Sequence, residues 1–256
     1  MSLPGRIILD EYRVIRPIAR GAVATVYLAL NGKGEPFAVK VFPEGYAARA
    51  DREWQVGRTL NHPNVNPVIR RLDLDTNPAV LLAHAPGQRL SDQPPAPVKF
   101  LAVFRQLLAA LAHMHERGFV HRDVKPENVI VDSHGHARLI DFDLSGPQRE
   151  TTQRLRLGTI AYIAPEQVRG ESASPATDVY AAGVILYWGL TGELPYVGSP
   201  KSVMRSHLHK PLPEAKGFEP DSALGQVLSR MVAKDPSERF SDASAALKAL
   251  NAIPEQ

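Results

Sequence analysis

A short run near the middle of the chain carries side chains suited to phosphate chemistry. The run His121-Arg122-Asp123-Val124-Lys125-Pro126-Glu127-Asn128 contains the carboxylate of Asp123 and the amide of Asn128, and a second carboxylate follows at Asp141. Two carboxylates and an amide that converge could bind Mg²⁺, which prefers hard oxygen ligands and phosphate oxygens. The remaining carboxylate could accept a proton from a hydroxyl nucleophile. Phosphoryl transfer needs these groups.

The sequence between these groups predicts a hairpin that would position them. Residues 129–131 and 137–140 are short apolar runs typical of strands, and Asp132-Ser133-His134-Gly135 between them favours a turn. A hairpin of this size would bring the two carboxylates and the amide to one end.

The composition is that of a soluble globular protein. The 256 residues are enough for one large domain or two small lobes, and 44% of them are hydrophobic and 22% charged. A net charge of +3 is too small to indicate nucleic-acid binding, so no nucleic-acid partner is expected.

Nothing in the sequence predicts export or a membrane span. Residues 1–10 contain no long apolar run, so we expect no signal peptide. The most apolar run, residues 179–190, is far shorter than the roughly 18 residues of a membrane helix and is predicted to be a buried helix. The absence of cysteine excludes disulfides and cysteine-ligated metals and is compatible with a reducing compartment, so we expect a cytoplasmic location.

The first part of the chain is predicted to be a β-rich lobe. Lys40 lies in an apolar strand, where its burial is costly without an anion, and Glu53 on the following helix could supply that anion. The turn Asn31-Gly32-Lys33-Gly34 favours a hairpin because Asn and Gly tolerate positive φ. The expected helix covers residues 47–60, and the expected strands cover residues 12–18, 24–30, 36–42, 65–74 and 79–85.

Beyond Ala85-Pro86-Gly87, which we expect to link two lobes, the chain is predicted to be mainly helical. Gly118 is placed to end the first of these helices. The apolar residues at helical spacing in that helix are Phe100, Phe104, Leu107, Leu111 and Met114, and further helices are predicted at 179–190, 202–208, 224–234 and 242–252. The predicted fold class is therefore α+β, with a small antiparallel β lobe carrying one main helix (1–85) and a larger, mainly α lobe (86–256).

With these elements in place, the chain resembles the catalytic domain of eukaryotic-like Ser/Thr protein kinases of the bacterial type. The resemblance extends from about Tyr12 to Leu250 and implies a bilobal protein-kinase-like fold. Each motif is weak alone, but all occur in the order of the family. The matching residues are Ala38-Val39-Lys40, Glu53, the run 121–128, Asp141-Phe142, Ala164-Pro165-Glu166, Asp178 with Gly183, and Arg239.

The resemblance implies a role for each residue of the first motif. Asp123 would be the catalytic base that accepts the proton of a serine or threonine hydroxyl, and Lys125 would contact the transferred phosphate of ATP. A lysine at this position is typical of Ser/Thr kinases. Asn128 and Asp141 would hold Mg²⁺ or Mn²⁺. The implied partners are ATP and proteins with Ser or Thr acceptors, in signalling.

The first lobe would bind the nucleotide. Lys40 would hold the α- and β-phosphates and pair with Glu53. The adenine would contact apolar positions, with Leu82 as gatekeeper, and hydrogen-bond to main-chain groups near residues 83–85. The implied nucleotide-contacting residues are Ile18, Gly21, Val26, Ala38, Lys40, Leu82, Ala83, Ala85 and Val131. Plain core packing is the alternative for the apolar members.

Other family positions imply regulation and support. Thr151 and Thr152 lie in the activation segment and are candidate autophosphorylation sites, although either could be an ordinary loop threonine. A phosphate there would add a charge of about −1.5 to −2, which Arg122 could bind. The resemblance identifies residues 121–128 as the catalytic loop. Structural roles are implied for Asp178, which would accept hydrogen bonds from the main chain of this loop, and for a buried ion pair between Glu166 and Arg239. The histidines are expected to be packing or turn residues, with His121 in the core.

The chain departs from the family pattern in three places. The phosphate-covering loop is Ala19-Arg20-Gly21-Ala22-Val23-Ala24, which keeps only the middle glycine of the family, so we expect a stiffer loop. Asp143 replaces the glycine after Asp141-Phe142; if that position needs positive φ, aspartate is among the better-tolerated residues. Its charge could also oppose the ATP phosphates or attract a cation. The stretch 88–97 is short for the helix that the family has there.

These departures keep two alternatives open. The first is a pseudokinase that binds nucleotide or partner proteins without turnover, although the residues of the family reaction are all present. The second is a kinase of small molecules such as antibiotics, against which Gly158-Thr159 and Ala164-Pro165-Glu166 indicate a protein substrate. The sequence leaves the substrate, the activating signal and the oligomeric state undecided.

Overall fold

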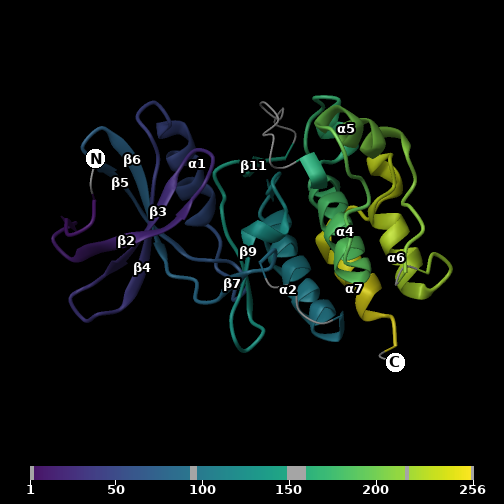
Figure 1. Ribbon diagram of the computed structural model, residues 1–256, viewed down its shortest axis with the longest axis horizontal. Helices are drawn as coiled ribbons and strands as arrows, with labels where there is room; N and C mark the ends of the chain where they lie inside the picture. The colour runs from purple at the N-terminus through teal and green to yellow at the C-terminus, as the bar shows by residue number, and fades with distance from the viewer. Residues whose placement is uncertain (1–2, 93–96, 149–159, 217–218, 255–256) are drawn as a thin grey trace. The chain divides into compact units, whose positions relative to one another are not determined.

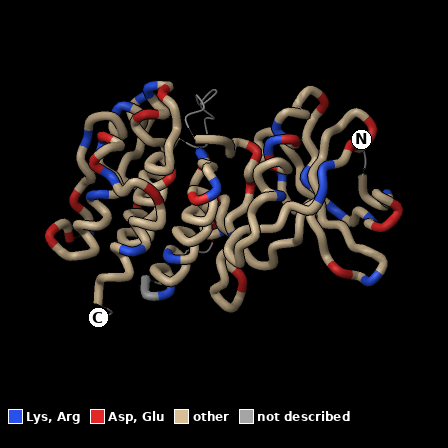
Figure 2. The backbone as a smooth tube through the Cα atoms, turned by 180° about the vertical axis from the view of Figure 1, so that it is seen from behind, with Lys and Arg blue, Asp and Glu red and all other residues tan. Residues whose placement is uncertain are grey.

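The computed structural model describes residues 3–92, 97–148, 160–216 and 219–254. The chain forms two compact units, one made of Met1–Pro86 with Ile140–Ser145 and the other of Gly87–Leu139 with Gly146–Gln256. Figure 1 shows the sheet of the first unit and the helices of the second. In both units acidic and basic residues are scattered among each other along the chain (Figure 2). None of the helices in the described residues is both long and apolar enough to cross a membrane.

The first unit is built on an antiparallel six-stranded sheet in the order β1-β2-β3-β4-β6-β5. All five predicted strands are present, and a short sixth strand, β1, pairs with β2 at one edge. β5 begins three residues later than predicted, because Pro67 has no N–H to donate and only its carbonyl is used, by the N–H of Ala83. The strands are β1 (Ile7–Ile8), β2 (Tyr12–Arg20), β3 (Thr25–Leu30), β4 (Pro36–Val41), β5 (Val68–Leu74) and β6 (Asn77–Ala83).

The two faces of this sheet pack against different parts of the unit. Val39 and Val41 of β4 lie in the core cluster of the unit, with residues from β2, β3, β5 and β6. Because side chains alternate along a strand, Ala38 and Lys40 lie on the opposite face. Helix α1 (Ala47–Gly57) covers that face, since its Glu53 reaches Lys40. α1 ends three residues before the predicted boundary, and the chain continues in turns.

The second unit is mainly helical, as predicted. Its helices are α2 (Pro97–Glu116), α3 (Pro165–Val168), α4 (Pro175–Thr191), α5 (Pro200–His209), α6 (Ala223–Met231) and α7 (Ala243–Asn251). The unit also contains two small sheets. One is formed by β7 (Gln88–Arg89), β9 (Val129–Val131) and β10 (Ala137–Leu139), and the other by β8 (Phe119–Val120) and β11 (Gly146–Pro147). The segment after Gly87 is β7 and not a helix in its described part, in keeping with the short stretch expected there.

Two helices form the centre of this unit. The five predicted apolar residues of α2 are all buried, and Gly118, predicted to end the helix, lies just beyond it with φ +78°, a left-handed conformation common after helices. α4 is buried along most of its length. A Cβ atom at Gly189 would lie 2.0 Å from the Phe100 ring, so the glycine lets the two helices approach closely.

The predicted hairpin of β9 and β10 is also confirmed. Val129 pairs with Leu139 and Val131 with Ala137 in an antiparallel register. The turn is closed by Asp132, whose carboxylate accepts hydrogen bonds from the main-chain N–H groups of His134 and His136 at 2.9 and 3.0 Å. Those hydrogen bonds lower the pKa of Asp132 below its usual value.

Candidate active site

Lys40 is held in the first unit by two carboxylates. Its Nζ lies 2.8 Å from Oε2 of Glu53 and 2.7 Å from Oδ1 of Asp141. The buried ammonium group therefore has one fully buried anion, Glu53, and one partly exposed anion, Asp141, which together offset its desolvation. Burial alone would lower the pKa of Lys40, but Asp141, Glu53 and Asp143 together raise it. The predicted pairing of Lys40 with Glu53 is present.

Asp143 does not occupy the glycine-like conformation considered from the sequence. The positive φ in this motif falls on Asp141, at 69°. Asp143 is 3% exposed, and its Oδ2 lies 3.4 Å from Nη1 of Arg49 on α1 and 3.8 Å from Nζ of Lys40. Burial, followed by the negative charge of Asp141, raises the pKa of Asp143 to about 7, against the opposing effect of Lys40. The extra carboxylate therefore contacts α1.

The candidate nucleotide-contacting residues include a group on one sheet face. Lys40 pairs with Val26, and Ala38 pairs with Leu82, in the registers of neighbouring strands. Cross-strand partners share a face, so all four side chains lie on the face covered by α1. The remaining candidates are placed as follows: Ile18 on β2, Gly21 between β2 and β3, Ala83 at the end of β6, Ala85 just beyond it, and Val131 on β9 of the second unit.

The glycine-poor loop closes as a tight turn. The N–H of Gly21 donates to the carbonyl of Ala24 at 2.8 Å. Gly21 is not in the left-handed region, and a Cβ atom there would lie 3.4 Å from the Ala24 oxygen. The turn therefore does not depend on a backbone conformation that only glycine adopts.

In the described part of the chain, the catalytic loop of the second unit leaves two buried acidic oxygens without a hydrogen-bond partner, Oδ1 of Asp123 and Oε2 of Glu127. Asp123 is 2% exposed, and its Oδ2 accepts from Nζ of Lys125 at 2.6 Å and from Nδ2 of Asn128 at 3.3 Å. Its Oδ1 is buried and has no hydrogen-bond donor in the described part of the chain. Buried polar atoms normally have partners, so an orphan oxygen indicates a missing donor. A substrate hydroxyl would be such a donor.

Asp178 fixes the main chain of this loop, as predicted. Its Oδ2 accepts from the N–H of His121 at 2.7 Å, and its Oδ1 accepts from the N–H of Arg122 at 2.8 Å. Sequence reasoning missed a third partner, His115 of α2, whose Nε2 lies 3.0 Å from Oδ2 of Asp178. The N–H of Ala243 donates to Nδ1 of His115, so Nε2 carries the proton that Asp178 accepts.

His115 could have been found from the helical pattern. It lies four residues after Leu111, on the buried face of α2, and is a polar residue in an otherwise apolar row. That spacing predicts a buried polar group at His115 but does not identify its partner. His121 is fully buried, as expected, and its Nδ1 accepts from the N–H of Asp123 at 3.3 Å.

The activation-segment prediction can be followed only in part. Arg122 has φ +68°, is 7% exposed, and donates from Nη2 to the carbonyl of Pro147 at 2.6 Å. Thr151 and Thr152 lie outside the described residues, as do Gly158 and Thr159.

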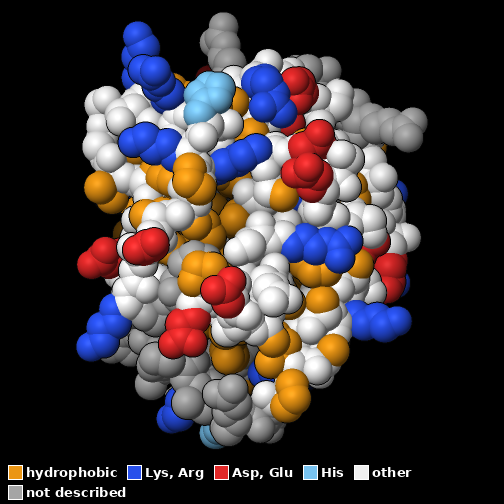
Figure 3. Space-filling view, turned by 90° about the vertical axis from the view of Figure 1, so that its right-hand side faces the viewer, with side chains coloured by type: hydrophobic (Ala, Val, Ile, Leu, Met, Phe, Trp, Pro, Cys, Tyr) orange, Lys and Arg blue, Asp and Glu red, His pale blue; other side chains and the backbone are white. Residues whose placement is uncertain are grey.

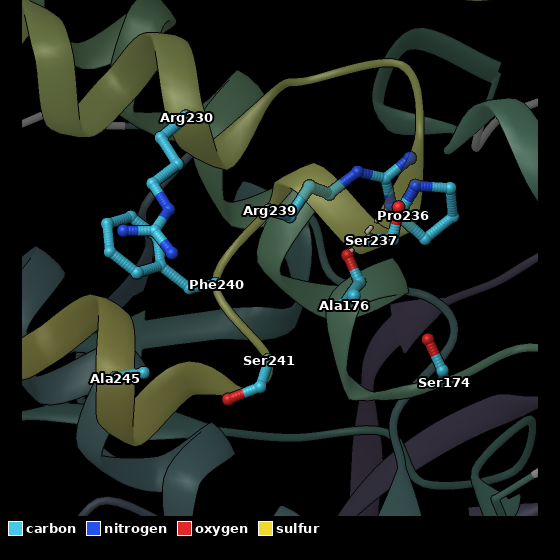
Figure 4. Close-up of a pocket in the computed structure, with 9 residues that line it drawn as sticks. All are labelled: Ser174, Ala176, Arg230, Pro236, Ser237, Arg239, Phe240, Ser241 and Ala245. Carbon is cyan, nitrogen blue, oxygen red and sulfur yellow. Dashed lines mark hydrogen bonds between the residues drawn. The ribbon is translucent and has the colours of Figure 1, made fainter.

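The predicted ion pair of Glu166 and Arg239 is present and buried. Nη1 and Nη2 of Arg239 each lie 2.8 Å from one carboxylate oxygen of Glu166, and both residues are 2% exposed. Arg239 also donates to three main-chain carbonyls, those of Ala176, Ala233 and Lys234. Figure 4 shows Arg239 beside Ala176, and the neighbouring Arg230 over the ring of Phe240. The pair joins α3 to the segment before α7.

Comparison with known proteins agrees with this geometry. The model of the protein kinase domain family matches residues 12–251, and the chain belongs to this family. The chain is 31% identical to the serine/threonine-protein kinase PrkC of Bacillus subtilis, covering 94% of this chain and 40% of PrkC. It is 35% identical to the DNA damage-responsive serine/threonine-protein kinase RqkA of Deinococcus radiodurans, covering 92% of this chain and 38% of RqkA.

A third relative is covered over more of its length. The chain is 32% identical to the serine/threonine-protein kinase PknL of Mycobacterium tuberculosis, covering 99% of this chain and 68% of PknL. The chain is thus homologous to bacterial Ser/Thr protein kinases, and it spans about two fifths of the length of PrkC and RqkA.

Proposed function

We propose that this chain is an active Ser/Thr protein kinase domain, which transfers the γ-phosphoryl group of ATP to serine or threonine hydroxyls of proteins. The observation that carries the proposal is the buried Oδ1 of Asp123, which has no donor in the described part of the chain. A hydroxyl nucleophile would donate to this oxygen and pass its proton to it.

Neighbouring groups prepare Asp123 for this task. Lys125 and Asn128 donate to the other carboxylate oxygen, so the carboxyl plane is fixed. Nδ2 of Asn128 also donates to the carbonyl of Asp123 at 2.8 Å, which fixes the amide itself. A fixed carboxylate orients the hydroxyl toward the phosphorus and needs no rearrangement during the reaction.

Family membership implies ATP with a divalent cation. The amide oxygen of Asn128 and the carboxylate of Asp141 would hold that cation. Both are hard oxygen ligands of the kind that Mg²⁺ and Mn²⁺ take. When bound, the cation would neutralise charge on the β- and γ-phosphates. Lys40, held by Glu53, would hold the α- and β-phosphates.

We further propose that the chain phosphorylates itself on the activation segment at Thr151 or Thr152. Threonine hydroxyls there are chemically equivalent to those of a protein substrate, and Arg122 lies in the catalytic loop as a cation for the product phosphate. This step and the substrates of the whole protein follow from family membership and chemistry.

Mass spectrometry of the purified chain tests the proposal. After incubation with ATP and Mg²⁺ or Mn²⁺, the unmodified sequence should carry phosphate on threonine or serine, and Asp123→Asn should carry none. A Thr151→Ala/Thr152→Ala variant should lose the activation-segment phosphate but still phosphorylate an added protein. Tight ATP binding with no phosphate transfer under either metal would contradict the proposal and favour a pseudokinase.

A further inference from the structure

A row of hydrogen bonds in the second unit crosses several elements and ends on the main chain next to the catalytic loop. We infer that His207 is a positioning residue for protein-substrate binding, because its ring fixes the carbonyl of Ala161 in a segment that Gln167 links to Arg122, the residue before Asp123. The inference rests on the proposed kinase function and adds a residue to it.

The row runs from Lys234 to Ala161. Nζ of Lys234 lies 3.2 Å from the Tyr180 oxygen, and that oxygen lies 2.9 Å from Nδ1 of His207. Nε2 of His207 lies 3.1 Å from the carbonyl oxygen of Ala161. His207 is on α5 and has no exposed surface, and Tyr180 is on α4 and 1% exposed. Bonds of this kind inside a protein are stronger than at the surface.

The direction of every bond in the row is determined by the last acceptor. A carbonyl can only accept, so Nε2 of His207 must carry a proton. In the neutral ring Nδ1 is then an acceptor, and the Tyr180 hydroxyl donates to it. The lone pairs of Tyr180 are left for the ammonium of Lys234. Burial, aided by the charge of Lys234, lowers the pKa of His207 to about 4, so the ring is neutral at physiological pH.

The segment held in this way is anchored to the catalytic loop at its other end. Oε1 of Gln167 accepts from the N–H of Ala164 at 3.1 Å, and Nε2 of Gln167 donates to the carbonyl of Arg122 at 3.0 Å. Arg122 immediately precedes the proposed base. The main chain from Ala161 to Ala164 therefore lies between His207 and the catalytic loop.

Apolar side chains pack this segment against α5. Ile160 and Ile163 form a buried cluster with Tyr196 and with Val203, which is one turn from His207 on the same helix. The cluster is non-directional and holds the segment near α5. The hydrogen bond to Ala161 is directional and fixes which way the main-chain carbonyl points.

We expect the orientation of the Ala161 carbonyl to affect the binding of a protein substrate more than the binding of ATP. Because Gln167 links this segment to the residue before Asp123, we expect a peptide that presents its hydroxyl to Asp123 to contact the main chain at 161–164. Loss of one buried hydrogen bond should weaken that contact by about fivefold to tenfold. The phosphoryl-transfer groups do not contact His207, so the rate with bound substrate should change by less than about twofold.

Three substitutions separate this role from simple core packing. His207→Gln keeps a donor and an acceptor on a shorter planar group, and His207→Phe keeps the ring without either. His209→Gln is the matched control, since His209 is on the same helix and exposed. The measurement is the steady-state rate at which an added protein is phosphorylated on Ser or Thr. The concentration of the protein is varied at fixed ATP, and then that of ATP at fixed protein.

The expected result is a separation of the kinetic constants. His207→Phe should raise KM for the protein about fivefold to tenfold, leave kcat and KM for ATP within about twofold, and be largely rescued in His207→Gln. His209→Gln should match the unmodified chain. An unchanged KM for the protein in His207→Phe, or equal defects in the Phe and Gln variants, would overturn the inference.

Hydrogen exchange gives a readout independent of activity. His207→Phe should speed amide exchange in the peptide spanning residues 160–164, and His207→Gln should not. Unchanged exchange in His207→Phe would overturn the positioning role. If the unmodified chain transfers no phosphate, the proposed function fails in that control, while the exchange data still decide whether His207 fixes the segment.

Discussion

The buried pair of Glu166 and Arg239 should be more sensitive to loss of the arginine than to loss of the acid. In the described part of the chain, removal of Arg239 leaves the Glu166 carboxylate 2% exposed with one donor, the hydroxyl of Thr177 at 2.8 Å. Removal of the Glu166 charge leaves Arg239 with three carbonyl acceptors and the ring of Tyr180, 4.7 Å away. Arg239 therefore keeps more hydrogen-bond partners without Glu166 than Glu166 keeps without Arg239.

The size of the effect follows from this inequality. Arg239→Met strands a buried charge, so it should lower the free energy of unfolding by about 3–5 kcal/mol. Glu166→Gln should lower it by about 1–3 kcal/mol, because the amide still accepts and the guanidinium keeps its carbonyls. The double variant should lose less than the sum, with a coupling energy of roughly 2–3 kcal/mol. A whole domain is stable by only about 5–15 kcal/mol, so Arg239→Met endangers folding.

Urea unfolding followed by circular dichroism measures these differences, provided that the slopes against urea agree among variants. The matched control is Arg169→Met, which breaks a pair with Glu171 of similar length, 2.7 Å, but with side chains 40% and 52% exposed. It should lower the free energy of unfolding by at most about 1 kcal/mol. Equal losses at Arg169 and Arg239, strict additivity in the double variant, or a larger loss in Glu166→Gln would refute the reasoning.

Three further predictions concern stability and the support of the catalytic loop. Because the pKa of His207 is lowered to about 4 in the folded chain, its contribution to stability is complete above its unfolded pKa of 6.5 and is lost as pH falls through 4. The unmodified chain should therefore lose about 2 kcal/mol relative to His207→Gln between roughly pH 7.5 and pH 5, and a constant difference in urea midpoints would contradict this. Gly189→Ala should lower stability by about 1–3 kcal/mol through its clash with Phe100, and Phe100→Leu in the same chain should restore part of it; a thermal midpoint unchanged by Gly189→Ala would contradict the packing. Asp178→Asn replaces one acceptor oxygen by an amide that opposes a main-chain N–H, so phosphate transfer should fall at least about tenfold while ATP affinity, measured by calorimetry, stays within about twofold; full activity would contradict the role of Asp178.

The sequence predicted elements whose causes are local. The hairpin after the catalytic loop follows from turn residues such as Asp132, and α2 follows from apolar spacing and the glycine at its end. The pairs Lys40–Glu53 and Glu166–Arg239 were predicted because each residue matches a motif of a family whose pairings are known. Residues outside such motifs gave no comparable signal.

Partners distant in sequence could not be predicted because packing alone brings them together. Asp143 lies 94 positions from Arg49, and the sequence indicated a missing glycine and a charge that could attract a cation, but not that Arg49 would be its partner. His115 and His207 each occupy a helix whose neighbours are decided by tertiary structure. Their hydrogen bonds to Asp178 and Ala161 depend on how these helices pack in the folded chain.

Asp123 is proposed to activate a hydroxyl for attack on ATP. The most direct measurement is the rate of transfer from terminally labelled ATP to a Ser/Thr protein by the unmodified chain and by Asp123→Asn, with ATP binding measured in the same samples. We expect equal ATP affinity in the two proteins and a rate lower by about 10²–10⁴-fold in Asp123→Asn. Equal rates in the two proteins, or ATP binding without transfer by the unmodified chain, would contradict it.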